Sequence, residues 1–258
     1  MKKQKIKDNT WDLFYELVRT DFTMRYHNSV LGFIWVLLKP FLLFLIIFTV
    51  FSWLFKSQDP YYNLNLLLGL LLFSYFSEAT LRGVTSLHDK ASIILKVNFP
   101  KIITLITSIV NSFISFLSGF LVFIIFWLFI QPPASLINLP YFLLQVLILS
   151  GLILGLSFFL SIIYIKLKDI LSIWEVFLRL IFYAAPIIYP LSIIPEKIKQ
   201  LFFFNPLTVV IVESRSALIT NQAFVWSRTL YALIITTIFL IAGFWYFQKN
   251  IKQVAEDF

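Results

Sequence analysis

Residues Ile102 to Ile165 read IITLITSIVNSFISFLSGFLVFIIFWLFIQPPASLINLPYFLLQVLILSGLILGLSFFLSIIYI, a run of 64 positions without one charged side chain. Such a run would form roughly 96 Å of helix, whereas one crossing of a bilayer core takes about 20 residues. Prolines and polar residues between Gln131 and Pro140 supply a turn near its middle. The run therefore predicts two membrane-spanning helices, at 102–130 and 139–165.

The whole chain has the composition of an integral membrane protein. Of its 258 residues, 60% are hydrophobic and 13% are charged, and the mean hydropathy is +0.89. Soluble domains carry about 25% charged residues, and disordered chains have low hydrophobicity. The composition therefore excludes an ordinary soluble enzyme and a disordered protein. The absence of cysteine excludes a disulfide framework and a thiol nucleophile, and two distant histidines leave little for a metal site.

Other charge-poor segments predict four further spans, at 30–55, 61–84, 171–189 and 226–247. The external region 190–224 is apolar but is interrupted by Asn205-Pro206 and carries Glu213 and Arg215. We expect re-entrant helices there, covered by protein, because lipid cannot satisfy a broken backbone. The predicted fold is one all-α membrane domain over 1–258 with six transmembrane helices.

The distribution of basic residues predicts the orientation of this domain. With the N-terminus in the cytoplasm, 16 Lys and Arg side chains lie on the cytoplasmic side and 5 lie outside. This excess agrees with the positive-inside rule and places both termini in the cytoplasm. A five-span chain with its ends on opposite sides is the alternative. The net charge of +8 then reflects topology, and no nucleic-acid partner is expected.

Two cytoplasmic segments have patterns that suit an interface. The segment 10–28 is expected to be an amphipathic helix, because Trp11, Phe14, Tyr15, Val18 and Phe22 recur with helical spacing between charged residues. It could anchor the chain at the membrane surface or dock a soluble partner. The region 85–100 contains the apolar run Ser92–Leu95 between charged groups, as expected of a short coupling helix. The pair Glu78 and Arg82, at i and i+4, could stabilise a helix end.

The sequence contains no nucleotide-binding, nucleophile-elbow or metalloprotease motif. We therefore expect no cofactor, no metal and no catalytic residue in this chain. If the protein uses ATP, another polypeptide binds it.

Several motifs resemble those of a known family. Residues 25–40 read R-Y-x-x-S-x-L-G-x-x-W-x-x-x-x-P, and the elements Lys96–Lys101, Ala185–Tyr189 and Phe204–Leu207 follow in order. This pattern closely resembles ABC-2 type permeases that export polysaccharides such as O-antigen and teichoic acid. Two positions differ from the family pattern. Lys168 stands before Asp169 where an arginine is usual, and Lys39 replaces a neutral polar residue.

The resemblance implies a half-transporter of the bacterial inner (plasma) membrane. Two copies would form the passage, and each would pair with a separate ABC ATPase, which binds ATP and Mg, in a 2:2 assembly. The cargo implied is a glycan on a polyprenyl pyrophosphate, moved from the cytoplasmic to the external side. A permease for a drug or a small lipid is the alternative. A membrane-embedded enzyme is a third class, disfavoured because the acidic residues are scattered.

The resemblance also assigns roles to residues. A pyrophosphate needs cations near the cytoplasmic entrance, and sugar rings stack on aromatic side chains. The substrate or channel candidates are Arg25, Phe33, Trp35, Lys39, Tyr75, Phe76, Trp174, Phe177 and Tyr183. The ATPase-coupling candidates are Trp11, Phe14, Tyr15, His88, Asp89, Lys90, Lys96 and Phe99. The external gate candidates are Pro186, Tyr189, Asn205 and Pro206.

Some of these residues also fit a simpler role in a membrane protein. Lys39 could reach the head groups instead of the cargo, and aromatic residues also gather at membrane interfaces. A stripe of small residues, Ser108 to Gly119, and the Gly151 and Gly155 pair suit close helix packing better than a channel wall.

Overall fold

The computed structural model describes residues 2–26, 32, 34–55, 59–97, 99–134 and 136–251. Within these ranges the chain forms helices and turns and no strand. The α-helices are α1 (Lys2–Tyr26), α2 (Ile34–Phe55), α3 (Tyr62–Asp89), α4 (Ala91–Lys96), α5 (Ile102–Ile130), α6 (Leu139–Lys166), α7 (Ile170–Ala184), α8 (Glu196–Phe202), α9 (Pro206–Arg215) and α10 (Trp226–Asn250). Three short turns are the 3-10 helices η1 (Leu136–Asn138) and η2 (Leu191–Ile193) and the π-helix η3 (Ser216–Thr220).

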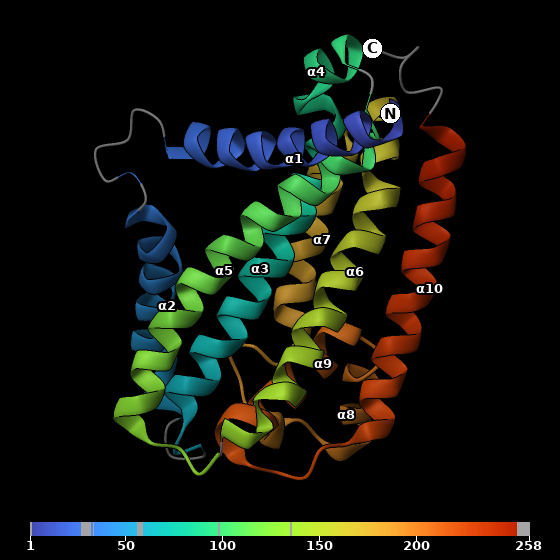
Figure 1. Ribbon diagram of the computed structural model, residues 1–258. Helices are drawn as coiled ribbons and strands as arrows, with labels where there is room; N and C mark the ends of the chain where they lie inside the picture. The colour runs from blue at the N-terminus through green and yellow to red at the C-terminus, as the bar shows by residue number, and fades with distance from the viewer. Residues whose placement is uncertain are drawn as a thin grey trace.

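Helices α3 and α6 form the centre of the bundle, and α5 and α10 lie outside them (Figure 1). Of the residues in the most apolar segment of each helix, 72% are buried in α3 and 61% in α6, against 17% in α5 and 22% in α10. The two inner helices therefore hold the core. The large apolar surfaces of α5 and α10 are suited to contact with lipid.

Helices α6 and α10 pack with their backbones in close approach. A β-carbon on Gly155 would lie 2.7 Å from the backbone carbon of Phe239, and one on Gly243 would lie 2.5 Å from the Gly155 carbonyl oxygen. Close helix packing is the role expected of Gly151 and Gly155, and this contact confirms it.

Four described helices, α3, α5, α6 and α10, are long and apolar enough to cross a membrane. The pair formed by α8 and the helix from Pro206 to Thr220 is bent by 106° and makes a fifth if it counts as one span. The predicted helices at 102–130 and 139–165 coincide with α5 and α6, and a helix break occurs where Asn205-Pro206 predicted one. The count of six spans stays a prediction.

The C-terminal ends of α3 and α7 differ most from the predicted span boundaries. Helix α3 continues past Val84 to Asp89, because the sequence contains no helix breaker there. Helix α7 ends at Ala184, before the predicted boundary at Tyr189. Its end is caused by Pro186, which lacks an N–H and forces Ala185 into an extended conformation with φ −93° and ψ 146°.

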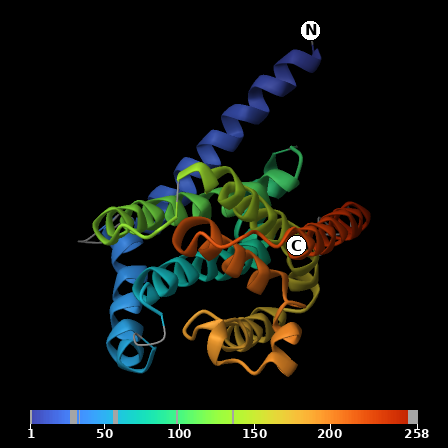
Figure 2. The same ribbon diagram turned by 90° about the horizontal axis from the view of Figure 1, so that it is seen from below.

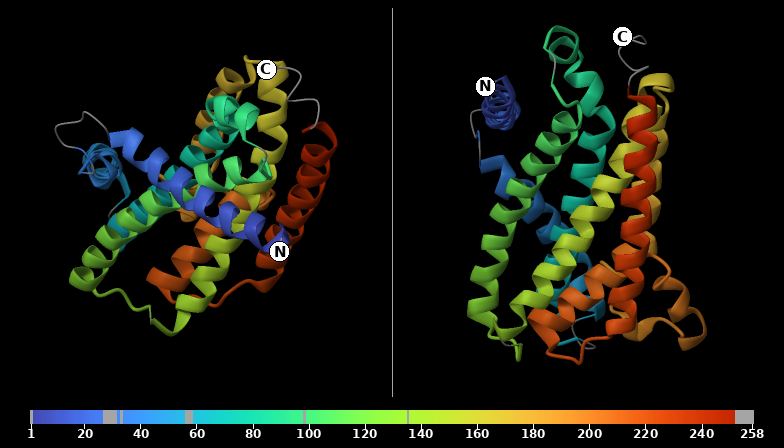
Figure 3. Two further views of the ribbon diagram at one scale, coloured as in Figure 1. Left: turned by 45° about the horizontal axis from the view of Figure 1, so that its top comes forward. Right: turned by 45° about the vertical axis from the view of Figure 1, so that its right-hand side comes forward.

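Helix α1 crosses one end of the bundle, and Figure 3 shows it running across the ends of the long helices near α4. It begins at Lys2, well before the predicted start at residue 10. The C-terminal end of α10 lies at the same end of the molecule as α1 (Figure 1). This end therefore gathers the elements expected to meet an ATPase.

Candidate functional site

Two adjoining cavities lie along α3. The first has a volume of about 320 Å³ and the second about 510 Å³. They share Leu43, Ser77 and Leu81, so we treat them as one lateral groove with α3 as its floor. Figure 2 shows α2, in light blue, and α7, in gold, flanking α3 on the same side of the molecule. The groove therefore opens between α2 and α7.

Polar side chains from otherwise apolar helices line this groove. Lys39 of α2, Glu78 of α3, and Glu175 and Arg179 of α7 all contribute to its walls. Charged side chains within membrane helices normally face a protein interior or a water-filled cavity. The groove therefore brings four charged side chains together on a mostly apolar wall along α3.

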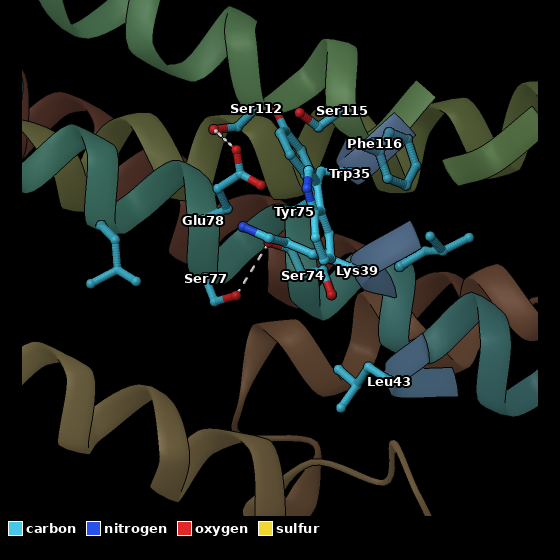
Figure 4. Close-up of a pocket in the computed structure, with 12 residues that line it drawn as sticks. Trp35, Lys39, Leu43, Ser74, Tyr75, Ser77, Glu78, Ser112, Ser115 and Phe116 are labelled. Carbon is cyan, nitrogen blue, oxygen red and sulfur yellow. Dashed lines mark hydrogen bonds between the residues drawn. The ribbon is translucent and has the colours of Figure 1, made fainter. Parts of the chain in front are cut away.

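Glu78 is held by two neighbours, Ser112 and Arg82, and Figure 4 shows its contact with Ser112 in the first cavity. Its Oε1 accepts hydrogen bonds from Ser112 Oγ at 3.2 Å and from Arg82 Nε at 3.1 Å. With 29% of its side chain exposed, the carboxylate is fixed in position and still accessible from the cavity. Sequence reasoning assigned Glu78 to the end of a helix and missed this role. The signal in the sequence was a carboxylate shortly after the apolar run Leu66–Phe73.

Two predicted aromatic residues, Trp35 and Tyr75, line the first cavity beside Lys39. Tyr75 is buried, its ring lies 5.3 Å from that of Phe116, and its hydroxyl is 2.9 Å from Ser150 Oγ. Tyr75 is therefore a rigid part of the wall. Lys39 lies at the cavity in an exposed position, which places it where a cargo could reach it.

The aromatic candidates on α7 have different surroundings. Tyr183 is exposed and lines the second cavity, whereas Trp174 donates its indole N–H to Thr80 Oγ1 at 3.0 Å. Phe177 is exposed and stacks on Trp174, with 6.2 Å between ring centroids. Phe76 is buried against Trp174 and lines neither cavity.

Two substrate candidates cannot be placed. Phe33 lies outside the described residues, as does the side chain of Arg25, although α1 includes its backbone.

Lys90 links three elements at the end of the molecule where α1 lies. Its Nζ forms an ion pair with Asp21 Oδ2 of α1 at 2.6 Å and donates to Thr107 Oγ1 of α5 at 2.7 Å. It also donates to the Thr104 carbonyl and to Ser108 Oγ, both at 3.2 Å. Burial lowers the pKa of Lys90 from the usual lysine value, and the hydrogen bond with Asp21 partly opposes this change. Lys90 was expected to face an ATPase, but it lies inside the protein.

The other coupling candidates are mostly on the surface. Trp11 and Tyr15 of α1 are 69% and 67% exposed, and Phe14 is partly buried. The buried face of α1 instead carries Leu17, which the proposed apolar stripe did not include. The exposed candidates near α4 are His88, Asp89 and Lys96, whereas Phe99 packs on a core cluster.

The short helix α4 matches the predicted apolar run at 92–95. Its Ile94 is buried in the chain's own core, and Leu95 is 56% exposed. Leu95 is therefore the apolar residue of α4 that is available to a partner.

Arg215 organises the opposite end of the bundle. Its guanidinium donates to the carbonyls of Pro186 at 2.6 Å, Ile187 at 3.0 Å and Asn65 at 3.0 Å. The Tyr62 hydroxyl donates to the Ile188 carbonyl at 2.8 Å. These contacts satisfy backbone carbonyls of the non-helical segment after α7, as buried backbone groups require.

The other external gate candidates have local structural contacts. Asn205 Oδ1 accepts from the Leu207 N–H at 3.0 Å and caps α9, and Pro206 occupies the first turn. The Tyr189 hydroxyl donates to the Tyr183 carbonyl at 2.8 Å. The Asn-Pro element therefore sets the start of α9.

A second polar network surrounds the buried carboxylate of Glu213 on α9. Its Oε2 accepts from the Tyr141 hydroxyl at 3.0 Å and from the Val225 N–H at 3.2 Å. Its Oε1 lies 3.9 Å from Arg228 Nη1. Sequence analysis placed Glu213 in the external region 190–224 and missed these contacts, because counting charges carries no information about distant partners.

The described residues contain no group of three or more side chains suited to holding a metal ion. The structure thus has a groove with charged side chains along α3. At one end of the bundle Lys90 joins three elements, and at the other end Arg215 binds the non-helical backbone after α7.

Comparison with known proteins assigns the chain to a family. A family model described as ABC-2 type transporter matches residues 12–219, which is most of the chain. The chain belongs to the ABC-2 type transporter family. The resemblance noted in the motifs is therefore confirmed, and the protein is the membrane component of a transport system.

Three proteins similar to this ABC-2 type transporter chain have names that refer to O-antigen export or polysialic acid transport. The chain is 28% identical to the O-antigen export system permease protein RfbA of Klebsiella pneumoniae over 209 residues. These residues make up 80% of this chain and 79% of that protein. An RfbA of Myxococcus xanthus is 27% identical over 250 residues, 95% of each chain. The polysialic acid transport protein KpsM of Escherichia coli is 23% identical over 236 residues, 90% of this chain and 89% of that protein.

Proposed function

We propose that this protein is the transmembrane subunit of an ATP-driven ABC exporter that moves a lipid-linked polysaccharide across a bacterial inner membrane. Membership of the ABC-2 family and the names of the relatives support this function. The observation that carries it is the lateral groove, which combines charged, hydroxyl and aromatic side chains on apolar helices.

The chemistry of the groove suits a glycan. Carboxylates and hydroxyls such as Glu78 and Ser112 can exchange hydrogen bonds with sugar hydroxyls, and Trp35 offers an aromatic face. Lys39 supplies a cation for an anionic group of the cargo. A single groove is open on one side. Two copies with their grooves facing each other would enclose the passage.

The assembly in this proposal is a homodimer with two ATPase subunits. Each chain has six spans, both termini in the cytoplasm, and the α8–α9 pair as a re-entrant element at the external side. The ATPase subunits bind ATP and Mg and dock on the end formed by α1 and α4. Their closure moves these helices and opens the groove to the glycan.

Deletion and reconstitution test this function. Deleting the gene should remove a cell-surface glycan while its lipid-linked precursor accumulates inside the cell, and the purified protein should retain an ABC ATPase. In proteoliposomes, transfer of a lipid-linked oligosaccharide should require ATP hydrolysis. An unchanged surface glycan together with failure to bind any ATPase would overturn the proposal. Transport of a small lipid without transport of the oligosaccharide would favour the alternative cargo.

A further inference from the structure

The contact of α1 with the bundle depends on a charge that lies inside the protein. Leu17 and Asp21, one helical turn apart, lie on the side of α1 that faces the bundle. Lys90 follows the last residue of α3 and precedes the first residue of α4. Asp21 therefore joins α1 to the point where α3 passes into α4.

The Lys90 ammonium contacts groups on two different helices, α1 and α5. Asp21 Oδ2 lies on α1, and Thr107 Oγ1, Ser108 Oγ and the Thr104 carbonyl all lie in the first turns of α5. The side chain is only 7% exposed. One ammonium thus holds α1, the α3–α4 junction and the start of α5 together.

Asp21 is needed because the other hydrogen-bond partners of Lys90 are neutral. A charged group removed from water is tolerated when it is paired and hydrogen-bonded, and loss of one partner leaves the other charge uncompensated. Without Asp21, the ammonium would recover hydration by moving out of its position between α3 and α5. Such a movement would release α1.

We propose that Asp21 and Lys90 are positioning residues that make α1, α4 and the start of α5 move as one unit. The Asp21–Lys90 pair ensures that a displacement of either surface element is passed to α5, whose Ser112 contacts the groove residue Glu78. The consequence for transport rests on the proposed function, whereas the mechanical link is a property of this chain alone.

The mechanical link can be measured without an ATPase. The chain contains no cysteine, so spin labels can be placed at T20C on α1 and L95C on α4, both exposed positions. Distances are measured by pulsed electron paramagnetic resonance in lipid nanodiscs, with an excess of unlabelled chain. The otherwise unchanged protein should give one narrow distribution. D21N should broaden it, and D21E, which restores the carboxylate, should narrow it again.

Two further variants separate the link from folding. D21N with K90M removes the buried charge together with its partner, so the protein should fold while the distribution remains broad. D12N is the matched control, because it makes the same substitution at an exposed aspartate of α1. It should leave the distribution narrow. Equal widths for the unchanged protein, D21N and the double variant would overturn the proposal.

A second experiment addresses transport in the complex with its ATPase. D21N should lower export per ATP hydrolysed by at least roughly tenfold while hydrolysis continues, and D21E should restore the ratio. If D21N exports with an unchanged ratio, the inference fails although the proposed function stands. If no ATPase binds but the distance distributions respond as expected, the proposed function fails and the link stands.

Discussion

The two ends of the bundle each use one cation to hold a break between helices, but the partners differ. Arg215 donates to three backbone carbonyls beside the end of α7 and the start of α3. Lys90 pairs with a side-chain carboxylate that belongs to a separate helix, α1. The planar guanidinium suits several fixed acceptors, whereas the ammonium acts as a point charge.

This difference suggests different mechanical properties. Carbonyl groups of the main chain cannot leave Arg215 without rebuilding the backbone after α7. Asp21 can leave Lys90 by a movement of α1 as a whole. We interpret the Arg215 end as a fixed support for the backbone after α7. We interpret the Lys90 end as the place where a movement of α1 is passed to the bundle.

The largest effect is expected from R215M. It would leave the carbonyls of Pro186 and Ile187, which follow the end of α7, without the Arg215 donor. Each unsatisfied buried group costs about 1–3 kcal/mol, so little folded protein should remain. R215K should be intermediate because it keeps the charge but loses the fork. Yield and thermal stability are measured by fluorescence-detected size-exclusion chromatography.

K199M is the control for R215M. Lys199 pairs with Glu196, whose side chain is 85% exposed, so its loss leaves no buried charge without a partner and should be milder. Equal losses for the two variants would contradict the role of Arg215 as a support.

The next effect is an asymmetry within the Asp21–Lys90 pair. D21N leaves an ammonium buried without its counter-charge, which costs about 3 kcal/mol, whereas K90M leaves Asp21 partly exposed to water and costs less. Hydrogen exchange of the α1 amides should therefore rise more in D21N than in K90M. A larger rise in K90M would show that packing, and not the charge, holds α1.

A smaller effect is expected between the two ends, at Glu78. E78Q keeps an acceptor for Ser112 Oγ but removes the negative charge from the groove, so export should fall roughly threefold to tenfold with normal protein yield. E196Q is the control, since Glu196 is exposed on α8 and pairs with Lys199 at 2.8 Å. Identical export by both variants would remove Glu78 from the passage.

The sequence predicted those parts of the fold that depend on local pattern. Helices α5 and α6 follow from a long uncharged run with one turn, and the break before α9 follows from Asn205-Pro206. The short helix α4 follows from an apolar run between charges. In each case the deciding residues are neighbours in the chain.

The sequence did not reveal contacts between distant residues. Arg215 was counted as a loop charge, although its acceptors include residues 186 and 187 and the distant Asn65. Lys90 was assigned to a surface that contacts a partner. The residues near it in the sequence do not indicate that it pairs with Asp21 on another helix. The candidates Trp35, Lys39, Tyr75 and Tyr183 do line the groove. Its charged residues Glu78, Glu175 and Arg179 were not assigned to it, because they lie far apart in the sequence on α3 and α7.

The smallest effect is expected at the cap of α9, next to the Arg215 support. N205A removes the acceptor of the Leu207 N–H and should lower stability by about 1 kcal/mol, with export retained. The thermal midpoint of the purified protein measures this loss. N205D, which keeps an acceptor oxygen, should retain the stability. Loss of export at full stability in N205A would instead assign Asn205 to a moving gate.

The lateral groove as the polar passage is tested most directly by cysteine accessibility in the membrane-embedded complex. S77C lies in the groove, and I241C lies on the outer surface of α10, where the isoleucine is 67% exposed. A charged, membrane-impermeant thiol reagent should modify S77C, with protection by bound lipid-linked glycan, and should leave I241C unmodified. Modification of I241C with none at S77C would contradict the account.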